Sequence, residues 1–365
     1  MSYDLGQQAV KQLIDLWQID KHRMVRTENG FDWWPGQNKI SVQVQEGETA
    51  EFAGTWRIRI VTDFVKEVDL TLDANTQALS NFARFSPSYG LSYTPTGLDP
   101  DLGITSDSRV FLSTTGYLRE DMISWMPKFL SGMAILQAID TSLAAIKTSR
   151  ILHGVSDTSG PNSIQADDNH DEMLDLGSTF FVPKGKERNL FDGLDEYEQF
   201  AANYGRSANC YGNGDSTGLT FETPLGEQSI LIRLSSTPEH PALGKGLQVT
   251  MQLPLEQTEA ETIQHCSWLN FLESMAWTNA PQLGSWHAQP ARVGLSDPDT
   301  RQGHYQIAYG CFVPNALFSH GIVTNLALWQ LGRASWVKSV LFPDLKDLTM
   351  PEILNRRFGI KDSSV

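Results

Sequence analysis

Two stretches near the N-terminus alternate between apolar and polar residues. The apolar positions are Ile40, Val42 and Val44 in 40–45, and Trp56, Ile58 and Ile60 in 55–61. Successive side chains of a strand point to opposite faces, so each stretch would bury one face and leave the other polar. The pattern predicts strands of an antiparallel sheet.

Other segments have the periodicity of helices. In 5–19 the apolar residues Val10, Leu13, Ile14 and Trp17 fall at i, i+3, i+4 and i+7, which is one face of an amphipathic helix. Two more helices are expected over about 74–85 and 120–147, and further strands near 31–34, 90–94 and 109–115. The predicted order of elements is α-βββ-α-ββ-α.

The same order recurs in the second half of the chain. The expected helices are 191–204, 258–277 and 316–341, and the expected strands are 218–221, 229–234, 247–253, 283–288 and 304–312. Matching positions lie 188 residues apart at Gly30 and Gly218, and 195 apart at Val110 and Tyr305. A nearly constant offset across so many elements indicates a duplication. The predicted fold class is therefore α+β, with two tandem units that each pack an antiparallel sheet against helices.

Composition places the boundaries of these units. Residues 151–189 are polar, acidic and poor in apolar periodicity, as linkers are. The expected organisation is a first α+β repeat over 1–150, an acidic linker over 151–189, a second repeat over 190–345 and a C-terminal tail over 346–365.

The net charge indicates which partners are disfavoured, and the cysteine content indicates the expected cellular location. The net charge is −15 over 365 residues, and no basic block interrupts it, so nucleic acid and anionic lipid are disfavoured. No apolar run approaches the length of a membrane span, and the N-terminus lacks the pattern of a signal peptide. Three separated cysteines fit a reducing compartment, and the cytoplasm is the expected location.

No motif predicts catalysis, a cofactor or a metal. Gly214–Gly218 matches G-x-S-x-G, but it lies in a Gly/Asn loop before a strand, whereas a nucleophile elbow needs a strand-to-helix turn. The acidic run 167–172 offers oxygen ligands without the spacing of a calcium loop, and a solvated linker is favoured. His265 and Cys266 are adjacent on a helix, so they point in different directions and suit a core.

Trp33 and Trp34 are the first candidates for binding a partner. Neighbours in a strand point to opposite faces, so the two rings cannot enter the same core. One of them is expected at a surface, where it makes an internal contact or, as the second alternative, anchors a partner protein.

Arg57 and Arg59 are the second candidates. They share the polar face of the predicted sheet with Ser41, Gln43 and Gln45. An ordinary solvated sheet face is favoured. Recognition of an acidic segment by the arginines is the alternative.

The element order resembles the fold of type III secretion chaperones and of the related YbjN-like bacterial proteins. GFDWWPG over 30–36 and WRIRIVTDF over 56–64 are also similar to bacterial proteins of that class. The resemblance covers about 1–150 and 190–345. It implies a helper without catalytic residues that binds another protein, often as a dimer, and here the fused halves would act as a pseudo-dimer.

The leading hypothesis is therefore a non-catalytic, chaperone-like adaptor of a bacterial cytoplasm that binds another protein, as a homo-oligomer or as a pseudo-dimeric monomer. An enzyme or small-ligand binder with a site between the halves is a second hypothesis. A structural subunit of a larger assembly is a third.

Overall fold

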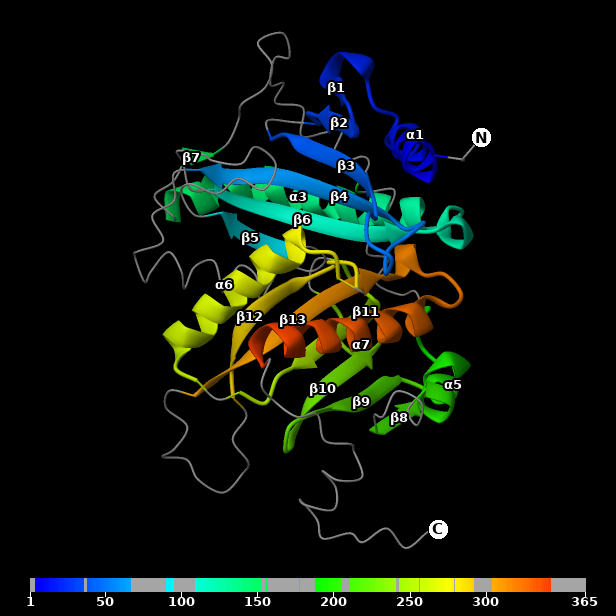
Figure 1. Ribbon diagram of the computed structural model, residues 1–365, viewed down its shortest axis with the longest axis vertical. Helices are drawn as coiled ribbons and strands as arrows, with labels where there is room; N and C mark the ends of the chain where they lie inside the picture. The colour runs from blue at the N-terminus through cyan, green and yellow to red at the C-terminus, as the bar shows by residue number, and fades with distance from the viewer. Residues whose placement is uncertain are drawn as a thin grey trace, which may run out of the picture. The chain divides into compact units, whose positions relative to one another are not determined.

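The computed structural model of the chain contains two antiparallel sheets packed with helices, so the predicted α+β class is confirmed (Figure 1). It describes residues 4–35, 38–66, 90–94, 109–151, 155–156, 177, 188–204, 211–240, 243–255, 257–278, 280–291 and 304–342. The chain divides into two compact units. Unit 1 comprises Met1–Val182, Ser267–Ala276 and Pro281–Ser285, and unit 2 comprises Pro183–Cys266, Trp277–Ala280 and Trp286–Val365.

Unit 1 is built on a sheet with the strand order β1-β2-β3-β4-β6-β5, in which the short β7 also pairs with β4. Its elements are α1 (Leu5–Trp17), η1 (Lys21–Arg23), β1 (Met24–Thr27), β2 (Gly30–Trp33), β3 (Ile40–Glu46), β4 (Trp56–Lys66), β5 (Gly90–Thr94), β6 (Arg109–Leu118), η2 (Glu120–Met122), α3 (Met126–Ile151) and β7 (Val155–Ser156). The predicted helix over 74–85 lies outside the described residues.

The second sheet has the order β12-β13-β11-β10-β9-β8. The elements around it are α5 (Asp195–Tyr204), β8 (Tyr211–Asp215), β9 (Gly218–Leu225), β10 (Gln228–Ser235), β11 (Gly246–Gln252), α6 (Glu259–Met275), β12 (Ser285–Pro290), β13 (Tyr305–Pro314), η4 (Asn315–Leu317) and α7 (Ile322–Leu341). The second half of α6 and residues 281–285 group with unit 1.

The two sheets have the same strand order when β1 is matched with β8. Read from β8, the second sheet runs β8-β9-β10-β11-β13-β12, and the first runs β1-β2-β3-β4-β6-β5. The prediction of three strands before the helix was one strand short, because the brief β1 and β8 carry no clear alternation. The boundaries predicted for the repeats, the linker and the tail stay predictions.

Equivalent hairpins open the two sheets. Thr27 pairs with Gly30 and Asp215 pairs with Gly218. The turn of each hairpin therefore consists of the two residues between the paired ones. A Cβ on either glycine would collide with a backbone oxygen of the next strand, that of Val42 or Leu234. Only glycine lets the neighbouring backbones approach so closely.

The apolar face of α1 anchors it on the first sheet. The side chain of Asp4 accepts a hydrogen bond from the Gln7 amide at 3.0 Å and so caps the start of the helix. Trp17, at the other end, stacks on Trp33 of β2 at 5.1 Å and meets Phe31 edge-on at 6.0 Å. The predicted face of this helix is thus the buried one, and it lies over β2, β3 and β4.

A buried polar group also ties α3 to this sheet. Gln137 donates to the Thr62 hydroxyl and to the Leu112 carbonyl, both at 2.8 Å, and accepts from the Thr114 hydroxyl at 3.0 Å. A buried amide with its partners satisfied costs little and fixes the helix against β4 and β6.

Candidate functional site

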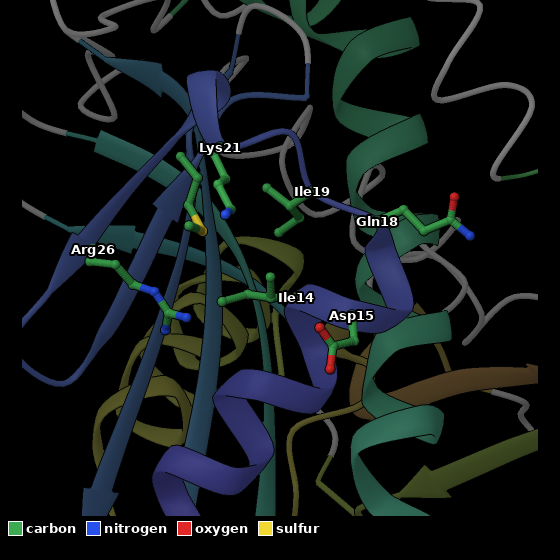
Figure 2. Close-up of a pocket in the computed structure, with 7 residues that line it drawn as sticks. Ile14, Asp15, Gln18, Ile19, Lys21 and Arg26 are labelled. Atoms are coloured by element: carbon green, nitrogen blue, oxygen red, sulfur yellow. The ribbon is translucent and has the colours of Figure 1, made fainter.

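A groove lies where α1 ends and the chain turns back into β1 (Figure 2). Its volume is about 560 Å³. We call it the α1–β1 groove, and it is lined by Ile14, Asp15, Gln18, Ile19, Lys21, Met24 and Arg26. One wall is therefore the last turn of a helix, and the other is the first strand of the sheet.

The end of α1 shapes the helical wall. Gln18 adopts the left-handed conformation with φ 49°, and the Ile19 amide donates back to the Ile14 carbonyl at 3.3 Å. This pairing is that of a Schellman motif, which stops a helix and turns the chain sharply. Asp20 then accepts from the His22 amide at 2.9 Å and starts η1, which leads into β1.

The strand wall is an edge of the first sheet. Among the described residues, β1 pairs with β2 alone. The Trp34 amide donates to the Arg23 carbonyl at 3.0 Å, and hydrogen-bonded pairs alternate along an antiparallel ladder. Val25 and Thr27 therefore bond to β2, whereas the backbone groups of Met24 and Arg26 point away from the sheet.

The side chains of Met24 and Arg26 lie on the same face of the sheet as α1. Met24 is opposite Trp33 and Arg26 is opposite Phe31, and both aromatic rings contact Trp17 of α1. Directly opposed residues share a face, so the two β1 side chains enter the groove from the strand. The open edge and the groove are thus continuous.

The groove carries two cations in an acidic protein. Lys21 and Arg26 are exposed, and within the described part of the chain neither forms an ion pair. Asp15 is the acidic residue of the lining, and Figure 2 shows it on the helix, with Ile14 between it and Arg26. The apolar side chains Ile14, Ile19 and Met24 are half-buried. The arrangement can accept a segment that is extended, partly apolar and anionic.

The two predicted tryptophans are both buried. Trp33 is 5% exposed and Trp34 is 6% exposed. Trp33 packs on α1, and the backbone of Trp34 continues the β1–β2 ladder. Neither ring is presented at the surface in this structure, and their role in binding a partner stays a prediction.

The predicted arginines are buried too, so the expectation of a solvated sheet face was wrong at these positions. Arg57 donates from Nη1 to the Met275 carbonyl at 2.8 Å and from Nη2 to the Ser274 carbonyl, at the end of α6. Arg59 donates to Gln43 Oε1 at 3.4 Å and lies 5.7 Å from the centre of the Phe111 ring.

Other residues of unit 1 cover this polar face and form hydrogen bonds with it. The side-chain oxygen of Gln282 accepts a hydrogen bond from the Ser113 hydroxyl at 2.6 Å. The backbone amide of Gln282 donates to the Thr115 hydroxyl at 2.7 Å. Arg57 and Arg59 lie on the sheet face opposite Trp33, so the four predicted residues do not form one site. A partner-binding role for the arginines stays a prediction.

Two of the remaining motifs lie among the described residues. Ser216 lies in the turn between β8 and β9, where Asp215 accepts from the Thr217 amide and hydroxyl, both at 2.7 Å, so no helix follows the serine. His265 Nδ1 lies 2.9 Å from Gln257 Oε1, and burial raises the pKa of the Cys266 thiol. The described residues hold no cluster of three His, Cys, Asp or Glu that could bind a metal. The run 167–172 lies outside them.

Reasoning from the sequence missed the α1–β1 groove. Lys21, Arg23 and Arg26 fall within six residues of an otherwise acidic chain, and this local charge was the available signal. It is short, and β1 has only four residues, so neither the strand nor its free edge stood out.

The candidate site of this α+β protein is therefore a cationic groove beside a sheet edge that no other described strand covers. Comparison with known protein families, with curated proteins and with solved structures found no match to the chain. None of the described helices is long and apolar enough to cross a membrane.

Proposed function

We propose that the chain is a non-catalytic, chaperone-like adaptor of a bacterial cytoplasm, and that it binds an extended segment of another protein along β1. The observation that supports this most directly is the outer edge of β1 next to the α1–β1 groove, with which no other described strand pairs. An extended peptide can add a strand to such an edge, gaining affinity from backbone hydrogen bonds and specificity from alternate side chains.

The geometry of β1 suits this mode of binding. The outward-facing N–H and C=O groups of Met24 and Arg26 provide the ladder, and their side chains line the groove beside it. Val25, on the opposite face, is 43% exposed. A strand laid along this edge would therefore contact a shaped surface on the α1 face.

The shared strand order supports the finer proposal that the protein is a tandem duplication of a secretion-chaperone-like unit. Both sheets begin with a two-residue hairpin closed by an obligatory glycine, Gly30 or Gly218. Two such units in one chain would replace the dimer implied by the resemblance, as a pseudo-dimeric monomer.

The test starts from affinity capture of the tagged full chain in its native host, followed by hydrogen exchange on the purified complex. We expect the amides of Met24 and Arg26 to become protected, whereas those of Val25 and Thr27 should change little because they already bond to β2. A stoichiometric partner that protects other regions would refute binding at β1. A protein recovered alone at native concentration would refute the adaptor.

A further inference from the structure

We infer that the α1–β1 groove selects a partner segment in which a carboxylate side chain accompanies an apolar one. This inference rests on the proposed function and specifies the chemistry of the segment that binds. The surface is cationic although the whole chain carries a net charge of −15.

The register of an added strand determines which of its side chains meet the groove. Side chains alternate along a strand, so every second residue of a segment paired with β1 would face α1. Met24 and Arg26 are the β1 residues on that face. Two partner residues, two positions apart, would then lie beside these side chains.

The groove offers each of them a different environment. Ile14, Ile19 and Met24 are half-buried, and further burial by an apolar side chain would remove their exposed area from water. Lys21 comes from η1 and Arg26 from β1, and both line the groove (Figure 2). A carboxylate there could accept a two-pronged hydrogen bond from the guanidinium of Arg26, with Lys21 as a second positive charge.

The two cations are available for this role. Within the described structure, Lys21 and Arg26 have no acidic partner. The neighbouring Arg23 is different, because it is half-buried and donates to the Pro35 carbonyl at 3.5 Å. A partner carboxylate would therefore supply an ion pair that the fold itself does not make.

The experiment selects a random peptide display library on the full chain and tests the recovered sequences as synthetic peptides. We expect recovered peptides to carry Asp or Glu two positions from an apolar residue. Replacing that acid by its amide should weaken binding about tenfold or more. Arg26→Gln and Lys21→Gln should each remove most of this difference, and added salt should reduce it.

Lys11→Gln is the matched control, because Lys11 is an exposed lysine of α1 outside the lining of the groove. The Lys11→Gln variant should bind the peptides with the affinity of the wild type. If peptides protect the Met24 and Arg26 amides from exchange but bind equally well as acid and as amide, the groove does not select a carboxylate. That result would refute this inference and would still support strand addition at β1. Peptides that bind elsewhere, or an empty selection, would overturn both proposals.

Discussion

The edge strands β1 and β8 occupy the same place in the two sheets but carry very different side chains. Met24 and Arg26 of β1 correspond to Gly212 and Gly214 of β8, since each pair stands at the same distance from its two-residue turn. In unit 2, α5 packs directly on β8, and a Cβ at Gly214 would lie 2.6 Å from the Tyr197 carbonyl carbon. In unit 1, α1 lies over β2, β3 and β4, and its end leaves a groove beside β1.

One strand order can therefore present two kinds of edge. Glycine lets a helix rest on the backbone of an edge strand, which covers one face of that strand. Longer side chains keep the helix away and line the space that remains.

The largest effect is expected at the aromatic stack beneath α1. Trp33→Ala removes the ring that Trp17 stacks on at 5.1 Å, and truncating a buried tryptophan costs about 3–5 kcal/mol of folding free energy. The measurement is chemical denaturation followed by circular dichroism. Trp268→Ala is the control, because Trp268 is 48% exposed and its loss should cost less than about 0.5 kcal/mol. Similar stabilities for the two variants would contradict the role of the stack.

The next effect concerns the polar faces of the two sheets. Arg57→Gln removes a buried guanidinium from the carbonyls of Ser274 and Met275, and hydrogen bonds of charged groups contribute about 1.5–3 kcal/mol. Arg233→Gln is the matched variant in unit 2, where Arg233 is exposed. Denaturation midpoints should fall for the first variant alone. An equal fall would mean that the two polar faces are equivalent.

A third prediction tests the role of glycine in β8. Gly214→Val places a branched side chain against the backbone of Tyr197, and such overpacking costs about 1–3 kcal/mol. Asn213→Val, on the same strand, is exposed and should be nearly neutral. Exchange of α5 amides would report the damage locally. A fully stable Gly214→Val variant would show that α5 does not need glycine beneath it.

The sequence predicted the features that depend on periodicity and turn chemistry. The alternation in 40–45 and 55–61 corresponds to β3 and β4, and the pattern of 5–19 corresponds to α1. The offset between Gly30 and Gly218 matched the starts of β2 and β9, which hold equivalent places in the two sheets, although the strands that precede them were missed.

The burial of the sheet's polar face and the position of the candidate site could not be predicted. They depend on which segments pack on each face of the sheet, and the periodicity of a segment does not encode this. Arg57 and Arg59 alternate with apolar residues, as exposed residues do, but both are buried in the structure. Arg57 donates to a carbonyl at the end of α6, and Arg59 lies against the ring of Phe111. Similarly, the free edge of β1 is a property of pairing in three dimensions. Only the local cluster of Lys21, Arg23 and Arg26 hinted at it.

The smallest effect is expected at the hairpin loops after β3 and β10. Different hydrogen bonds close these loops in the two units. In unit 1 the Gly47 amide bonds to the Thr55 carbonyl at 2.9 Å, and no histidine takes part. In unit 2 the Leu243 amide donates to His240 Nδ1 at 3.1 Å, which requires that nitrogen to be unprotonated. Burial lowers the pKa of His240 below its usual 6.5.

The sign of the pH dependence follows from that lowered pKa. As the pH falls below about 6.5, the unfolded chain binds a proton at this histidine more readily than the folded chain does, so the free energy of unfolding decreases until the folded pKa is passed. Above pH 7 the contribution is constant. Denaturation midpoints between pH 7.5 and about 5 should decline less in His240→Gln than in the wild type. His304→Gln, at an exposed position, should keep the wild-type profile, and identical profiles for all three proteins would mean that the His240 loop does not distinguish the two units.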